Sequence, residues 1–261
     1  MRFIGFYDYT VILTYLSLVS STVGMVCAQR GRFALAVCCL AFSGICDMFD
    51  GIVARSKKNR SDDEKAFGIQ IDSMADIISY GIFPSLIVYK LAIGDVQYPI
   101  EHPIQARIAI CICALYLLSA LIRLSYFNVD EMQRQSQTTD KRHEYRGLPV
   151  TSVAIVLPTV FIGSYFTGTA RPPILPCLGL LLLMGILFIT PFKMPKPAFL
   201  GKLILIVIGL LEFVMLLLGK AYYVPTKHNE SSVMFENHAV IQDSVKNDTD
   251  TVDLKSLISG D

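Results

Sequence analysis

Charged residues are scarce in this sequence, and their scarcity argues against an ordinary soluble domain. Asp, Glu, Lys and Arg make up 17% of the 261 residues, while hydrophobic residues make up 53% and the mean hydropathy is +0.51. A soluble domain of this length carries about a quarter of its residues as charged side chains. The composition therefore predicts a polytopic membrane protein.

Two further absences narrow the possibilities. The seven cysteines show no metal-binding spacing and no C-x-x-C pair, and most lie in apolar segments, where cysteine behaves as a small buried hydrophobe. The opening MRFIGFYDYT lacks the basic region, apolar core and small-residue cleavage site of a signal peptide. We therefore expect the first apolar helix to be retained as a membrane anchor.

Apolar runs long enough to cross a bilayer occur about seven times. We expect membrane helices at residues 10–28, 33–54, 72–93, 106–127, 149–167, 173–191 and 199–220. They form one membrane-embedded domain, 1–223, and the polar, acidic residues 224–261 form a tail that we expect to be disordered. Pro84 and Pro158 fall inside two of the runs, where either can kink its helix.

Loop charges indicate an orientation. Loops 55–71 and 128–148 are rich in Lys and Arg, whereas loop 94–105 has neither. The positive-inside rule places the first two loops in the cytosol, although Arg30 and Arg32, in a short outer loop, oppose this orientation. The acidic run at 62–64 is expected to be part of a solvated linker.

Four aspartates stand at the edges of the first basic loop. Asp47 and Asp50 are three positions apart, and Asp72 and Asp76 are four apart, so each pair lies on one face of its helix. An ionised carboxylate at the edge of hydrocarbon is costly unless something compensates its charge. Hard divalent cations take oxygen ligands, so the pattern predicts a site for metal-bound phosphate.

Small residues and an arginine accompany the aspartates. Gly51 and Ala54 let a ligand approach the helix backbone closely. Arg55 can offer a planar fork to phosphate oxygens, and as an ion-pair partner it can satisfy only one of the four carboxylates. Gly68 is expected to open the next helix, where free backbone N–H groups favour an anion. Together these residues predict a site for a nucleotide diphosphate and a metal.

The full pattern is D-x-x-D-G-x-x-A-R from Asp47 to Arg55, twelve further residues, then G-x-x-x-D-x-x-x-D from Gly68 to Asp76. It resembles the signature of the CDP-alcohol phosphatidyltransferase family at every fixed position. The resemblance implies an all-α, polytopic membrane helix bundle with a six-helix core, here with one extra C-terminal apolar helix, and a homodimer. It also implies transfer of a phosphatidyl group from a CDP-linked lipid to an alcohol, with release of CMP.

The acceptor alcohol is suggested by a narrower likeness. The twelve-residue gap is longer than in most acceptor classes of the family, and the stretches 72–84, 123–129 and 147–154 look like the phosphatidylserine synthase branch. This likeness implies CDP-diacylglycerol as donor and L-serine as acceptor. The N-terminal element typical of the family matches only at Thr14, and the last apolar segment and the tail have no counterpart in the core family.

The resemblance also implies roles for individual residues. Two divalent ions, Mn²⁺ or Mg²⁺, are held by aspartates, for which the candidates are Asp47, Asp50, Asp72 and Asp76. Asp76 is expected to be the general base that takes the proton from the serine hydroxyl. Gly51, Ala54, Arg55 and Gly68 are expected to bind the CDP-lipid.

The carboxylate of serine needs a cation. Arg123, near the cytosolic end of the fourth helix, and Arg146, just before the fifth, are the candidates. The alternative for either arginine is that it snorkels to lipid phosphate.

Two other functions stay open. One is the same reaction with glycerol 3-phosphate, inositol or an inositol phosphate as acceptor. The other is a cation transporter with the aspartates as a relay, which predicts inverted repeats; the sequence shows no internal repeat. For the enzyme we expect an integral protein of a bacterial or archaeal cell membrane, with its active site facing the cytosol, membrane lipids around it and no nucleic-acid partner.

Overall fold

The computed structural model describes most of the chain. The described residues are 5, 9–57, 61–94, 103–137, 144–166, 172–195 and 199–222. The chain divides into two units, Met1–Lys220 and Ala221–Asp261, and nearly all of the described residues belong to the first. The predicted tail, 224–261, lies outside the described residues, so its disorder and the boundary at residue 223 stay predictions.

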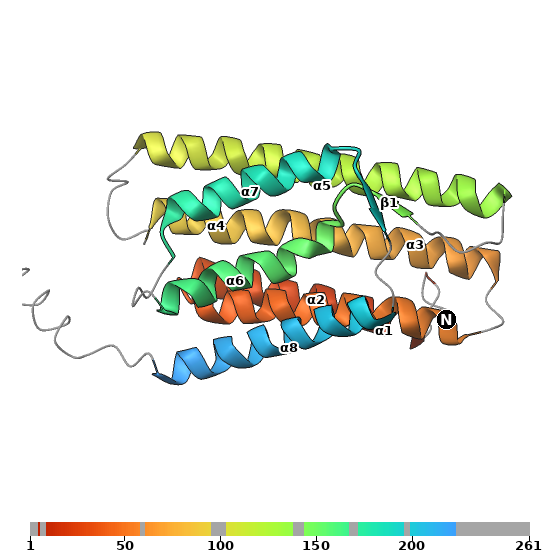
Figure 1. The fold of residues 1–261 in the computed structure, drawn as a ribbon, viewed down its shortest axis with the longest axis horizontal. Helices are drawn as coiled ribbons and strands as arrows, with labels where there is room; N and C mark the ends of the chain where they lie inside the picture. The colour runs from red at the N-terminus through yellow and green to blue at the C-terminus, as the bar shows by residue number, and fades with distance from the viewer. Residues whose placement is uncertain are drawn as a thin grey trace, which may run out of the picture. The chain divides into compact units, whose positions relative to one another are not determined.

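Helices make up most of the described residues of the first unit (Figure 1). They are α1 (Ile12–Gln29), α2 (Phe33–Ser56), α3 (Asp62–Asp76), α4 (Phe83–Ile93), α5 (Pro103–Gln137), α6 (Val153–Phe166), α7 (Ile174–Ile189) and α8 (Phe199–Tyr222). Two short 3₁₀ helices, η1 (Tyr9–Val11) and η3 (Val150–Ser152), lead into α1 and α6. Strands β1 (Glu144–Arg146) and β2 (Lys193–Pro195) pair antiparallel, with Tyr145 opposite Met194. The predicted all-α bundle is confirmed, and a helix occupies each predicted span.

Length and composition mark this protein as integral to the membrane. Among the described residues, four helical stretches are long and apolar enough to cross a bilayer: Tyr9–Gln29, Phe33–Val53, Asp62–Ile93 and Ile104–Asp130. Three shorter apolar stretches accompany them at Val150–Ser164, Ile174–Ile189 and Ile204–Leu218.

Glycines bring the helices around the core close together. A Cβ on Gly24 of α1 would stand 2.2 Å from Cζ of Phe83, the first residue of α4. A Cβ on Gly44 of α2 would stand 2.7 Å from the Cβ of Ala154 on α6. A side chain at either position would require these neighbouring atoms to shift, so glycine allows α1 to approach α4, and α2 to approach α6, this closely.

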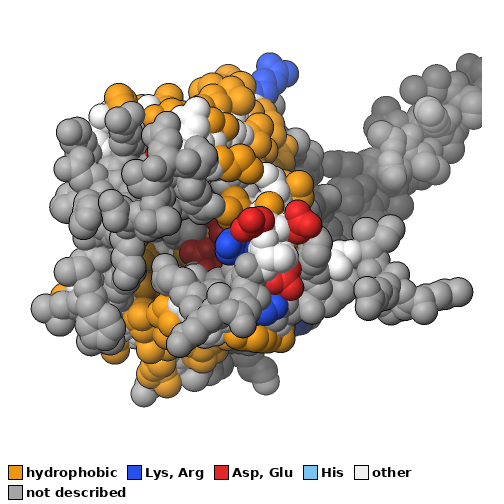
Figure 2. Space-filling view, turned by 90° about the vertical axis from the view of Figure 1, so that its right-hand side faces the viewer, with side chains coloured by type: hydrophobic (Ala, Val, Ile, Leu, Met, Phe, Trp, Pro, Cys, Tyr) orange, Lys and Arg blue, Asp and Glu red, His pale blue; other side chains and the backbone are white. Residues whose placement is uncertain are grey.

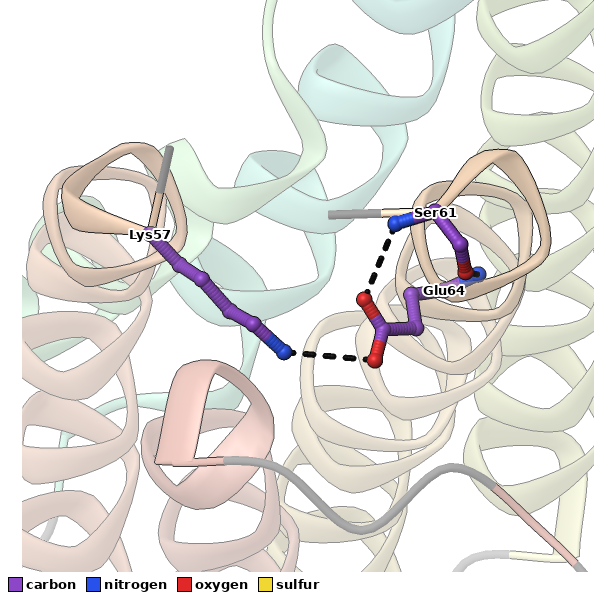
Figure 3. A network of polar contacts seen from close by, with 3 residues as sticks. All are labelled: Lys57, Ser61 and Glu64. Carbon is purple, nitrogen blue, oxygen red and sulfur yellow. Dashed lines mark hydrogen bonds and ion pairs between the residues drawn. The ribbon is translucent and has the colours of Figure 1, made fainter. Parts of the chain in front are cut away.

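Two helices extend beyond their apolar runs, which corrects the predicted loops. α3 begins at Asp62 rather than at residue 72, because Ser61 and Glu64 form a capping box: the Glu64 amide donates to the Ser61 hydroxyl at 3.2 Å and the Ser61 amide to the Glu64 carboxylate at 3.0 Å (Figure 3). The prediction of a solvated linker at 62–64 is therefore wrong; acidic residues suit the first turn of a helix. α5 likewise continues to Gln137 rather than ending near residue 127.

The predicted disturbance at Pro84 takes the form of a π-helical segment, η2 (Ile77–Ile82), between α3 and α4. Pro84 has no N–H to donate to the Tyr80 carbonyl. The hydroxyl of Tyr116, on α5, donates to that carbonyl at 2.5 Å. One turn along, the Ser85 hydroxyl donates to the Gly81 carbonyl at 2.9 Å. Pro158 lies inside α6, which continues through it.

Candidate metal centre

Three of the four predicted aspartates form one cluster. Asp47 and Asp50 come from α2 and Asp72 from α3, and one carboxylate oxygen of each lies within 4.8 Å of the others. All three side chains are half-buried. Figure 2 looks onto the end of the bundle where α2 ends and α3 begins, and shows one recessed acidic patch beside a Lys or Arg side chain, with further acidic side chains at the surface.

The fourth aspartate, Asp76, belongs to the same face but not to the group of three. Its side chain contacts Asp47 at hydrogen-bonding distance, and the side chains of Asp50 and Asp72 make a contact of the same kind. The two helices run antiparallel: the earlier aspartate of α2, Asp47, meets the later one of α3, Asp76, and Asp50 meets Asp72. Carboxylates of both helices thus meet at one place in the fold.

A further pair of polar side chains lies one helical turn beyond Asp47 and Asp76, towards the middle of α2. Ser43 precedes Asp47 by four positions, Tyr80 follows Asp76 by four, and the Ser43 hydroxyl donates to the Tyr80 hydroxyl at 3.3 Å. On α1, Ser17 Oγ lies 2.6 Å from Ser43 Oγ, and Ser21 Oγ donates to it at 3.1 Å. All four side chains are buried. A network of hydroxyls thus lies next to the carboxylates, one helical turn from Asp47 and Asp76.

Sequence reasoning missed this hydroxyl network. A tyrosine and serines within apolar runs are typical of ordinary core residues, and nothing in hydropathy sets them apart. The available signal was spacing: Ser43 and Tyr80 each lie one helical turn from an aspartate, on the same face.

The cluster suits a divalent cation. Like-charged carboxylates this close repel one another unless a cation or a proton lies between them. Asp72 Oδ1 is buried and, among the described residues, has no hydrogen-bond partner, so it can still accept a ligand bond. Carboxylate oxygens are the ligands that Mg²⁺ and other hard cations prefer. The residues present fit such an ion.

The predicted small residues are partly where the sequence placed them. Gly51 is half-buried in α2, directly after Asp50. Ala54 and Arg55 belong to α2 by backbone, but their side chains lie outside the described residues. Gly68 does not open α3 as predicted, because the helix starts at Asp62 and its first amides face the Ser61–Glu64 cap. Gly68 instead lies one turn before Asp72, on the same face of the helix.

A comparison with protein families now decides the assignment. The family model described as CDP-alcohol phosphatidyltransferase matches residues 10–218, which include all four aspartates. This chain belongs to the CDP-alcohol phosphatidyltransferase family. The predicted resemblance is confirmed, and it covers helices from α1 into α8 rather than the motif alone.

Within the phosphatidyltransferase family, curated relatives carry names that specify serine. The chain is 30% identical over 171 residues to a CDP-diacylglycerol–serine O-phosphatidyltransferase of Helicobacter pylori (strain J99), covering 65% of this chain and 64% of that protein. It is 25% identical over 175 residues to an archaetidylserine synthase of Methanothermobacter thermautotrophicus, covering 67% and 66%. A protein of Methanocaldococcus jannaschii with the same name as the Helicobacter one is 23% identical over 215 residues, covering 79% and 88%. The first two matches thus span slightly less than two thirds of those relatives.

Of the two arginines predicted to bind the acceptor, only Arg123 has a described side chain. Arg123 on α5 is buried; its Nε donates to the Leu148 carbonyl at 3.2 Å and its Nη2 to the Gly147 carbonyl at 3.5 Å. Its guanidinium carbon lies 5.7 Å from the ring centre of Phe127. Gly147 has a φ of 75°, which favours glycine. Arg123 therefore ties α5 to the turn before α6, and a role in binding the acceptor stays a prediction.

Arg146 lies in strand β1, where its backbone pairs with Lys193 of β2. Its side chain is outside the described residues. Its predicted role is therefore untested.

Proposed function

We propose that this protein transfers the phosphatidyl group of CDP-diacylglycerol to the hydroxyl of L-serine, giving phosphatidylserine and CMP. The observation that carries the proposal is the group of three carboxylates within 4.8 Å, at the motif that defines the family. The names of the relatives from Helicobacter and Methanocaldococcus support serine as the acceptor.

Asp47, Asp50 and Asp72 are the proposed ligands of two divalent ions, Mn²⁺ or Mg²⁺. When bound, such ions offset the charge of the diphosphate and of the phosphoryl group during transfer. Two features support this assignment: Asp72 Oδ1 has no hydrogen-bond partner among the residues that the structure describes, and the carboxylates repel one another.

Asp76 is the proposed general base. It stands outside the group of three yet touches Asp47, so one of its oxygens can face a substrate beside the ions. The serine oxygen forms a bond to the phosphorus of the lipid, the bond from that phosphorus to the oxygen of CMP breaks, and the serine proton goes to Asp76. No covalent intermediate on the protein is needed.

The CDP-lipid is proposed to lie along the α2 and α3 faces. Gly51 and Ala54 allow close approach to α2, and Arg55 pairs with phosphate oxygens. Gly68 leaves the turn before Asp72 free of a side chain, which replaces the helix-start role expected from the sequence. Arg123 and Arg146 are the proposed partners of the serine carboxylate.

The proposed setting is a homodimer with its active site facing the cytosol. The segments 55–71 and 128–148 are rich in Lys and Arg. The positive-inside rule favours a cytosolic location for such segments. Exposed apolar residues along α1, for example Leu16, Val19 and Val23, suit contact with membrane lipids or a second copy.

The test is an acceptor competition with purified protein. CDP-diacylglycerol and Mn²⁺ or Mg²⁺ are incubated with labelled L-serine, glycerol 3-phosphate or inositol in parallel. We expect labelled phosphatidylserine and CMP in the serine reaction only. Product from glycerol 3-phosphate or inositol, with none from serine, would overturn the choice of acceptor.

A further inference from the structure

The Ser79 hydroxyl is buried and has no hydrogen-bond partner in the described part of the chain. Ser79 belongs to η2, its side chain is fully buried, and its Oγ has no hydrogen-bond partner among the described residues. A buried hydroxyl that makes no hydrogen bond is destabilising, and more so within a membrane.

This state is unusual because a helical serine has an easy alternative. Its hydroxyl can donate to the carbonyl four residues earlier. Ser85 does so to Gly81 at 2.9 Å, Ser119 to Leu115 at 2.8 Å, and Thr159 to Ile155 at 3.0 Å. Ser79 departs from this pattern within a π-helical segment, and such segments are frequent at functional sites.

Ser79 lies close in sequence to the aspartates of the proposed site. In the described part of the chain, the buried side-chain atoms without a partner are Asp72 Oδ1, Ser79 Oγ and Glu212 Oε2. The first two lie on the continuous helix α3–η2, seven positions apart, with Asp76 between them. Ser79 lies three positions beyond Asp76, less than one turn further along the helix. The two unpaired groups therefore flank the proposed base, one on each side along the helix axis.

We propose that the Ser79 hydroxyl contacts the acceptor alcohol, and this inference rests on the proposed function. In the proposed site, a metal ion binds Asp72 Oδ1. The acceptor alcohol is then the ligand that can form a hydrogen bond with Ser79 Oγ. Ser79 and Asp76 are less than one helical turn apart, a separation that a small amino acid spans. With its hydroxyl at Asp76, serine can present its ammonium or carboxylate group to Ser79, since a hydroxyl both accepts and donates.

The experiment compares Ser79→Ala with a matched control, Ser85→Ala, in the full-length protein. Ser85 is also a buried serine on the same continuous helix, but its hydroxyl is already paired within the helix. Initial rates are measured against L-serine at saturating CDP-diacylglycerol, and then against CDP-diacylglycerol and Mn²⁺. Thermal midpoints in detergent are recorded for all three proteins.

For Ser79→Ala we expect KM for serine to rise about tenfold, the usual effect of losing one hydrogen bond to a substrate. KM for CDP-diacylglycerol and the half-saturating Mn²⁺ concentration should stay at wild-type values. The thermal midpoint should not fall, because the hydroxyl removed has no partner among the described residues of the free protein. Ser85→Ala should leave KM for serine unchanged.

An unchanged KM for serine in Ser79→Ala overturns the inference, as does an equal rise in both substrates' KM values. A lower thermal midpoint with unchanged kinetics also overturns it, because the hydroxyl then has a structural partner. The proposed function fails separately: in that case the wild-type protein itself forms no phosphatidylserine, and the inference falls with it.

Discussion

The four aspartates divide into two kinds of site residue. Asp47, Asp50 and Asp72 share one cluster of oxygens, while Asp76 contacts that cluster at Asp47. The sequence predicted all four from spacing, because spacing on a helix decides which side chains share a face. The family resemblance, rather than the spacing, set Asp76 apart as the expected base. Which carboxylates cluster depends on how α3 is set against α2.

Asp76→Asn should abolish turnover while leaving CDP-diacylglycerol binding nearly unchanged. An amide keeps the shape of the carboxyl group but takes up no proton, and loss of a general base lowers kcat by about a hundredfold or more. The measurement pairs CMP release with binding of the CDP-lipid. Asp62→Asn is the control, since Asp62 is exposed in the first turn of α3. Near-normal turnover in Asp76→Asn would remove the base assignment.

Asp50→Ala should remove a metal ligand. We expect Mn²⁺ binding, followed by electron paramagnetic resonance, to weaken at least tenfold and activity to disappear with it. Asp63→Ala, which deletes an exposed carboxylate on α3, should bind Mn²⁺ as the wild type does. Wild-type affinity in Asp50→Ala would show that the ions are held elsewhere.

At the scale of elements, α3 and η2 carry most of what the sequence did not predict. The start of α3 was missed because hydropathy detects only the apolar part of a helix, and its first turns hold exposed residues such as Asp62 and Lys65. The cap at Ser61 and Glu64 was readable as a capping box. Its contact with the end of α2, where Lys57 Nζ lies 3.2 Å from Glu64 Oε1, depends on tertiary structure (Figure 3).

Tyr116→Phe tests how η2 is held. The variant keeps the ring, which packs 5.5 Å from that of Phe188, and removes the hydroxyl that donates to the Tyr80 carbonyl. Pro84 offers no N–H in its place, so we expect the free energy of unfolding to fall by about 1 kcal/mol. Thermal unfolding in detergent measures the change, with Tyr15→Phe on α1 as control. Equal stability of the two variants would show that this hydrogen bond does not hold η2.

At the scale of the whole molecule, composition and the apolar runs predicted the class and the positions of the helices. One motif in the sequence predicted the family. The family model matches residues 10–218, which covers the helix bundle as well as the motif. Packing was beyond the sequence: that Gly24 meets Phe83, or that Ser43 meets Tyr80, depends on which helices become neighbours. The hydroxyl network and the unpaired Ser79 result from that packing.

The central claim is that clustered carboxylates of α2 and α3 hold divalent ions for transfer of a phosphatidyl group to serine. The most direct measurement adds Mn²⁺ stepwise to metal-stripped protein with CDP-diacylglycerol and labelled L-serine, and quantifies phosphatidylserine and CMP together. The account predicts no product without metal, and equal amounts of both products once Mn²⁺ is supplied. Full activity in the stripped protein, or CMP release with no labelled lipid, would contradict it.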